Sequence, residues 1–332
     1  MRAADISKLI LGLVAATGVA AMSVPAGAAQ GDSDFPRRPI RLIIPFAAGA
    51  SADIVARIIG PRLSEALGQP IVIDSRPGAG GVLAADLVAK AAPDGHTLLM
   101  GTPGPLTINP VLLPGIPYQP KRDLAPVTLV VIVPSILIVK PSLPAASVKE
   151  LVALARAQPG QLNYASAGVG SVPHLAGELF KLLTRVDIAH IPYKGSSAAI
   201  TDMLGGQISM FFDNIASALP YAKSGRLRAL AITSPQRSDS VPELPTMIEA
   251  GVPNYVAFSW NGIVAPARTP KAAIERLSRE IRAVLTAPDI RDKLKELGAD
   301  IVGNTPSEFA TLMAEETAKW TRVVRDANIK PE

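Results

Sequence analysis

The sequence contains no cysteine, and only three of its 332 residues are histidine. The lack of cysteine excludes disulfide bonds, thiol catalysis and a cysteine-linked lipid anchor, so packing alone must stabilise the fold. The histidines are dispersed and match no metal-ligand spacing such as H-E-x-x-H, so no metal is expected. The patterns G-x-S-x-G and G-x-G-x-x-G are also missing, so neither a hydrolase elbow nor a dinucleotide cofactor is indicated.

Charged residues are scarce as well, at 18% of the chain against 48% hydrophobic residues. This balance is typical of a large α/β core and argues against a disordered chain. Lysine and arginine are scattered, without a basic run interleaved with aromatic residues, so nucleic-acid binding is not expected despite the net charge of +5. The length of the chain favours two domains over one.

The first 30 residues have the layout of a secretory signal peptide. A positive start with Arg2 and Lys8 precedes the apolar run Leu9–Val24, and A-G-A at 26–28 is a small-residue cleavage site. A membrane helix is the alternative, but the apolar run is shorter than the ~20 residues of a span and is rich in alanine and glycine. We therefore expect residues 1–28 to be a cleaved signal peptide and the mature protein to lie outside the cytoplasm.

Short runs of strand-forming residues alternate with helical patterns along the rest of the chain. Such alternation indicates an α/β fold with parallel strands and helical crossovers. The expected strands lie at 40–45, 71–73, 97–100, 162–165, 188–191 and 208–212.

Two further apolar runs are interpreted as crossings between domains. Val127–Val139 contains one proline and is long for a single strand, as expected where the chain passes from one domain into another. Leu227–Ile232 is the candidate for the return crossing. We therefore expect a clamshell of two α/β lobes, with 34–132 and 229–332 in the first and 133–228 in the second.

Two small-residue loops, Phe46–Asp53 and Ser166–Ser171, follow predicted strands and precede predicted helices. Backbone N–H groups at a helix N-terminus point outward and the helix dipole favours negative charge there, so each loop is a candidate anion site. Ligands of open α/β sheets bind at the carboxyl ends of the strands, where both loops lie. The alternative is that the small residues only form tight turns. That interpretation is favoured for Gly78–Gly81, which could also line the cleft.

Two polar residues near these loops each have two interpretations. His174, just inside the helix after the second loop, either contacts the ligand or packs within the fold. Asp213 ends the apolar strand MFFD and either caps the following helix or accepts a hydrogen bond in the cleft. His190 and Trp260 are expected to be packing residues, and Trp260 lies either in the core or at the hinge.

Several longer stretches carry a family resemblance. They include PFAAGASAD at 45–53, RPGAGG at 76–81, GTPG at 101–104, SAGVGSVPHLAGELF at 166–180, HIPYKGS at 190–196 and LRALAITS at 227–234. Their order and spacing are highly specific, and over nearly the whole mature chain they resemble the Bug (TctC-like) family of periplasmic solute-binding proteins.

The resemblance implies a two-lobed periplasmic-binding-protein fold of type II, the Venus flytrap. It also implies capture of a small carboxylate and its delivery to an inner-membrane tripartite tricarboxylate permease. The ligand class covers di- and tricarboxylates, amino-acid-like acids and aromatic acids, and no cofactor is implied. We expect a monomer in which the two loops grip one carboxylate from opposite lobes, partly through water. The expected ligand-binding residues are Phe46, Ala48, Gly49, Ser51, Asp53, Thr102, Ser166, Ala167, Gly168, Ser171, His174 and Asp213.

Three positions depart from the family pattern. Ala50 stands where glycine is usual, Leu106 where histidine is usual, and Val169 where a polar residue is usual. Leu106 and Val169 should make the cleft less polar, which favours an apolar or aromatic acid over a citrate-like one. A periplasmic ligand sensor is an alternative function. A periplasmic hydrolase is a less favoured one, since it needs a nucleophile–base pair that the sequence does not reveal.

Overall fold

The first strands form a parallel group around β1 (Ile40–Ile44). In the computed structural model, which describes residues 35–193 and 195–330, β1 pairs in parallel with β2 (Ile71–Ser75) and with β3 (Thr97–Gly101). Four of the five β1 residues are buried, as expected for a parallel strand covered on both faces. The predicted signal peptide lies outside the described residues. The longer helices of this part are α1 (Ser51–Leu67) and α2 (Val82–Ala89), and η2 (Ala79–Gly81) directly precedes α2. The short η3 (Gly104–Ile108), α3 (Asn109–Leu112) and α4 (Pro120–Asp123) follow β3.

A second parallel group forms around β5 (Asn163–Ser166). This strand pairs in parallel with β6 (Ala189–Pro192) and with β7 (Met210–Asn214). The predicted alternation of strands and helices is therefore confirmed in both halves of the chain. The helices that accompany these strands are α5 (Val148–Ala157), α6 (Val172–Thr184), α7 (Ser196–Leu204) and α8 (Ile215–Lys223).

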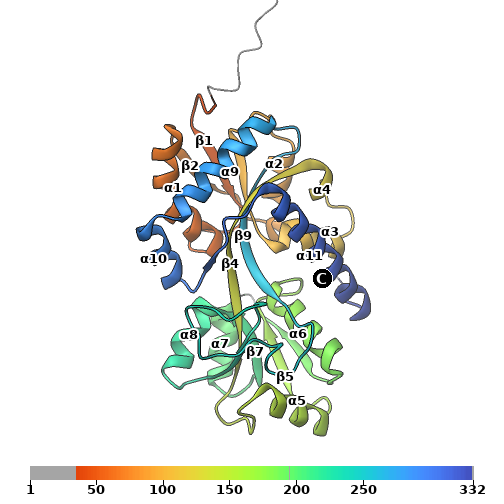
Figure 1. Ribbon diagram of the computed structural model, residues 1–332. Helices are drawn as coiled ribbons and strands as arrows, with labels where there is room; N and C mark the ends of the chain where they lie inside the picture. The colour runs from red at the N-terminus through yellow and green to blue at the C-terminus, as the bar shows by residue number, and fades with distance from the viewer. Residues whose placement is uncertain (1–34, 194, 331–332) are drawn as a thin grey trace, which may run out of the picture. The chain divides into compact units, whose positions relative to one another are not determined.

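The long strand β4 (Leu124–Val139) connects the two groups (Figure 1). Its first part, up to Pro134, pairs with β9 (Phe258–Pro266), and its last five residues pair with β7. The sheet order is therefore β2-β1-β3-β9-β4-β7-β5-β6. The predicted crossing within Val127–Val139 is confirmed, because a single strand continues through both groups.

The predicted return crossing at Leu227–Ile232 is wrong. β8 (Arg228–Ile232) pairs with Ile136–Val139 of β4, so it belongs wholly to the second group of strands. The chain returns only at β9, whose first residue, Phe258, pairs with Pro134. A short buried apolar run has the same sequence pattern in a strand of one lobe as in a crossing, which explains the error. The predicted lobe boundary at 228/229 lies too early for the same reason.

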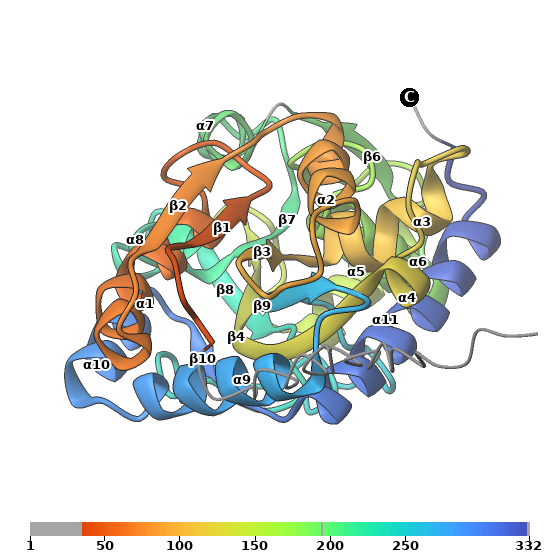
Figure 2. The same cartoon turned by 90° about the horizontal axis from the view of Figure 1, so that it is seen from above.

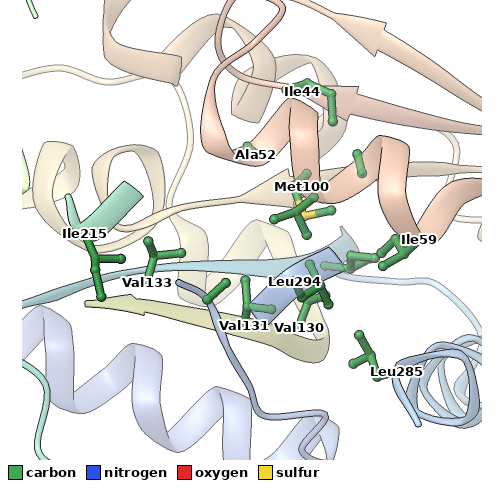
Figure 3. Packing of buried hydrophobic residues seen from close by; sticks show 14 of the residues in the cluster. Ile44, Ala52, Ile59, Met100, Val130, Val131, Val133, Ile215, Leu285 and Leu294 are labelled. Carbon is green, nitrogen blue, oxygen red and sulfur yellow. The ribbon is translucent and has the colours of Figure 1, made fainter. Parts of the chain in front are cut away.

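Buried side chains continue from one group of strands to the other, and residues from Phe35 onward form one compact unit. One hydrophobic cluster contains Ile44 and Ile59 near the first strands, Val131 and Val133 along β4, and Ile215 at the start of α8 (Figure 3). The two lobes are therefore halves of one unit that share a core along β4.

Near the C-terminus, α9 (Lys271–Leu285) and α11 (Pro306–Asp326) both pack against β4 (Figure 2). The buried apolar side chains of α9 cluster with Ile263 of β9 and those in the first turns of α11 cluster with Trp260, so these parts of the two helices belong to different hydrophobic clusters. A capping box is present at the start of α11, where the Thr305 and Glu308 side chains each accept a hydrogen bond from the other residue's backbone N–H. Trp260 is fully buried, with the ring of Phe309 edge-on at 5.4 Å, which confirms its predicted packing role. The remaining elements are α10 (Pro288–Glu296) and β10 (Asp300–Ile301).

Candidate functional site

A cleft of about 410 Å³ lies where the two groups of strands meet, a size within the range of small-molecule sites. Three parts of the fold line it. The first half contributes Phe46, Ser51, Ala52, Gly80, Thr102, Pro103, Gly104 and Asn109. The second half contributes Ala167, Val169, Gly170, Ser171, Val172, Pro173, Ser196, Asp213 and Asn214. The connecting strands β4 and β9 contribute Ser135, Ser259 and Asn261.

Half of the predicted ligand-binding residues line this cleft. These are Phe46, Ser51, Thr102, Ala167, Ser171 and Asp213. The other six are in the same two loops or beside them, but they do not form the cleft wall: Ala48, Gly49, Asp53, Ser166, Gly168 and His174. The structure thus brings both predicted loops to one cleft.

The N-terminus of α6 and the loop before it line the cleft, and some of their backbone N–H groups are free. Ser171 is the N-cap of this helix, and its Oγ accepts a hydrogen bond from the N–H of His174. The first turn carries no acidic residue. Among the described residues, no acceptor bonds the N–H groups of Ala167, Val169 and Val172. Together with the positive end of the helix dipole, these N–H groups are an arrangement that favours an anion, so the α6 N-terminus stays a candidate anion site.

Hydrogen bonds within the loop Ser166–Ser171 and the conformation of Gly170 stabilise this loop. Ser171 Oγ donates to the carbonyl oxygen of Gly168 at 2.6 Å, and the N–H of Gly168 donates to Ser166 Oγ at 3.1 Å. Gly170 has a φ of +75°, and a Cβ there would lie 2.6 Å from a methyl carbon of Leu112. This position therefore requires glycine both for its backbone conformation and for space.

His174 supports the loop from behind and does not line the cleft, so the prediction that it contacts the ligand is not supported by its position. It is 5% exposed, and its Nδ1 accepts the N–H of Gly170 at 3.1 Å. The ring stacks on His190 with the centroids 4.0 Å apart. Burial, with the ring of His190 as the second cause, lowers the pKa of His174 to about 4. The imidazole is therefore neutral at pH 7, with its proton on Nε2.

The N-terminus of α1 differs from that of α6 because it already holds a carboxylate. Asp53 Oδ2 accepts the N–H of Gly49 and the Nε–H of Arg57, each at 2.9 Å. The bond from Arg57 lowers the pKa of Asp53, so this carboxyl group is charged at neutral pH. Ser51 and Ala52, in the first turn, still line the cleft. The two loops are therefore unequal as candidate anion sites, because the start of α1 already has a carboxylate and the first turn of α6 has none.

Asp213 does not cap α8, which corrects one of its two predicted roles. Asn214 is the cap, since its side chain accepts the N–H of Ala216 at 2.9 Å. The Asp213 carboxylate is fully buried and accepts the hydroxyl groups of Ser196 at 2.6 Å and Ser217 at 2.5 Å. Burial raises the pKa of Asp213 above its usual range. Both of its oxygens thus already accept hydrogen bonds from hydroxyl groups of the protein.

The cleft contains polar groups with unused hydrogen-bonding capacity. Thr102 is 6% exposed, and its Oγ1 has no hydrogen-bond partner within the described part of the chain. Asn109, which the sequence analysis did not single out, donates its Nδ2–H to the carbonyl oxygen of Gly80 at 3.0 Å. Gly78–Gly81 is thus a turn that also contributes Gly80 to the cleft wall. Ser135, Ser259 and Asn261 were missed because they lie inside apolar strand patterns.

Two residues that depart from the family pattern, Val169 and Leu106, were expected to make the cleft less polar, and they lie in different places. Val169 lines the cleft. Leu106 is buried in the core of the first half, so its effect on cleft polarity was overestimated. Among the described lining residues, Asp213 is the only ionisable one, and neither lysine, arginine nor histidine occurs. An anion there would be held by neutral N–H and hydroxyl donors.

Within residues 35–193 and 195–330, no cluster of three or more histidine, aspartate or glutamate side chains is arranged to hold a metal ion. None of the helices in those ranges combines the length and the apolar character of a membrane span.

Comparisons with known proteins agree on one family. Residues 55–329 match the family described as "Tripartite tricarboxylate transporter family receptor". Protein BugT of Bordetella pertussis is 39% identical over 319 residues, which cover 96% of this chain and 98% of BugT. Two solved structures from Rhodopseudomonas palustris are also similar. One, solved with adipate, is 38% identical with a TM-score of 0.78, over 90% of this chain and 100% of that one. The other, MatC with bound malate, is 35% identical with a TM-score of 0.74, over 87% and 100% of the two chains.

Proposed function

Since this chain belongs to the tripartite tricarboxylate transporter receptor family, we propose that it is a periplasmic receptor that captures a small carboxylate in the cleft. The observation that carries the proposal is the N-terminus of α6, where the N–H groups of Ala167, Val169 and Val172 have no acceptor among the described residues. A ligand carboxylate there would complete hydrogen bonds that the fold leaves open. Delivery to a membrane permease is the expected next step, and adipate and malate in the two relatives are carboxylates of the proposed kind.

A hydrolase is the second candidate, because one serine–histidine pair has suitable geometry. Ser166 Oγ lies 2.7 Å from His190 Nε2. However, Ser166 is fully buried and does not line the cleft, and its Oγ also bonds the backbone of Gly168. A nucleophile needs access to its substrate, so the pair fits a structural role and the receptor is favoured.

A thermal-shift screen tests the proposed function. The panel would contain malate, citrate, adipate, nicotinate and hexanoate, each beside its neutral amide. A ligand present at 100 times its Kd should stabilise the protein by about 2.7 kcal/mol, which raises the unfolding temperature measurably. We expect at least one acid to produce a shift that its amide does not. Shifts with no acid, or equal shifts with acids and amides, would contradict the proposal.

Export is expected to remove the N-terminal segment. We expect N-terminal sequencing of the periplasmic fraction to start at Ala29 or Gln30, after the A-G-A motif at 26–28. Recovery of the intact chain with Met1 from the cytoplasm would count against this prediction.

Ligand binding is expected to bring the lobes together. Two strands, β4 and β9, pass between the two groups of strands and pair with each other up to Pro134 and Phe258. Hinge closure about a few residues of such connections is a common response to ligand. We expect small-angle scattering to give a smaller radius of gyration for the monomer at saturating ligand. An unchanged radius would contradict closure.

A further inference from the structure

A second cavity, of about 630 Å³, adjoins the cleft on the side of α8. Ile54 and Val55 of α1 line it, together with Val133 of β4, Ala216 of α8, and Leu297. Among the described residues that line this cavity, none carries an ionisable side chain. The cavity therefore offers mainly apolar surface.

The two cavities share a wall beside the anion site. Phe46, Ser51, Ala167, Ser196 and Asn214 line both. Ala167 belongs to the loop before α6, and Ser51 belongs to the first turn of α1. The second cavity is therefore adjacent to the α6 N-terminus, where the ligand carboxylate is proposed to lie.

The hydroxyl groups in the second cavity are already used by the protein. Ser196 and Ser217 donate to Asp213, at 2.6 and 2.5 Å. Ser51 donates to Asn261 Oδ1 at 3.0 Å. A second carboxylate placed here would meet no free hydroxyl among the described lining residues. The described side chains of the second cavity thus offer a second carboxylate neither a cationic partner nor a free hydroxyl group, whereas Ile54, Val133 and Leu297 offer an alkyl or aryl group apolar contact.

We propose that the second cavity is a subsite for the apolar part of the ligand, so that this receptor selects acids that carry an alkyl or aryl chain. The inference rests on the proposed function, because the binding of the ligand carboxylate at α6 determines where the apolar chain of the ligand lies. Each buried methylene should tighten binding by up to about fourfold. The expected ligand class is thus a monocarboxylate with an apolar chain or ring.

Calorimetric titration of the full chain at pH 7 tests the subsite with butanoate, hexanoate, octanoate and adipate. Kd should fall from butanoate to octanoate, and hexanoate should bind more tightly than adipate, which has the same carbon count and a second carboxylate. Ala216 is an exposed residue of α8 that lines the second cavity, so Ala216→Trp would place a large ring at the wall of that cavity. It should weaken octanoate at least tenfold and change butanoate less than twofold.

Ala222→Trp is the matched control, because it lies on the same helix and lines neither cavity. It should bind all four acids as the unmodified chain does. A Kd independent of chain length, adipate binding as tightly as hexanoate, or equal weakening of butanoate and octanoate by Ala216→Trp would overturn the subsite and leave the proposed function standing. Binding of no carboxylate at all would overturn the proposed function, and the subsite with it.

Discussion

Replacement of Ser171 by aspartate is expected to weaken carboxylate binding at least tenfold, or by about 1.4 kcal/mol. Ser171 lines the cleft and caps α6, and aspartate is an equally good N-cap, so the helix should keep its start. The new carboxylate would stand beside the N–H groups that are proposed to hold the ligand. Like charges about 4 Å apart near a protein surface repel by roughly 4 kcal/mol, which exceeds the threshold of the prediction. Calorimetric titration with the acid that performs best in the thermal-shift screen measures the effect.

Two control variants separate charge from structural damage. Ser171→Asn keeps the cap without charge and should bind within about threefold of the unmodified chain. Ser142→Asp adds the same charge in an exposed turn outside the cleft and should change little. If Ser171→Asp binds as tightly as the unmodified chain, the anion site is not at the start of α6.

Acidification from pH 6.5 to pH 4 is expected to destabilise the fold through His174 by about 3 kcal/mol. The pKa of His174 is lowered to about 4 in the native state, mainly by burial, against the ordinary value of 6.5. The unfolded chain therefore takes up a proton in this interval before the native state does, so the free energy of unfolding falls as the pH falls. Each unit of difference corresponds to about 1.4 kcal/mol. Urea unfolding at pH 7, 6, 5 and 4 measures the slope.

His174→Asn isolates this contribution from that of the carboxylates, which titrate in both proteins. The asparagine Oδ1 can accept the N–H of Gly170 as Nδ1 of His174 does, but it does not titrate. Three neighbouring groups also bear on this titration, since His190 and Lys181 lower the pKa of His174 and Glu178 raises it. The unmodified chain should lose about 3 kcal/mol more than His174→Asn between pH 7 and pH 4. Parallel pH profiles would show that His174 is not held neutral by the fold.

The sequence predicts local features of the fold well and long-range pairings less well. The 13-residue run Val127–Val139 identifies a crossing because few strands within one lobe are so long. Leu227–Ile232 gives no such signal, because its six residues fit a strand in either position. Only the pairing of β8 with Ile136–Val139, and of Phe258 with Pro134, decides where the chain returns.

The same limit applies to the cleft. Loops after strands at 46–53 and 166–171 are recognisable because small residues precede a helical pattern. The roles within them depend on contacts that spacing does not show. The ring of His174 in α6 stacks on the ring of His190 in β6. Asp213 accepts hydrogen bonds from Ser196 of α7 and Ser217 of α8. Such contacts are set by packing, so the sequence indicated both residues without giving their partners.

Calorimetric titration with matched acids and amides tests the central claim, that neutral donors at α6 hold a carboxylate. Hexanoate and hexanamide have the same chain, as do adipate and adipamide, and only the acids carry negative charge at pH 7. Charge-assisted hydrogen bonds contribute roughly 1.5–3 kcal/mol each, so two of them correspond to at least a hundredfold in Kd. We expect an acid to bind at least a hundredfold more tightly than its own amide. Equal affinities for acid and amide in both pairs would contradict the account.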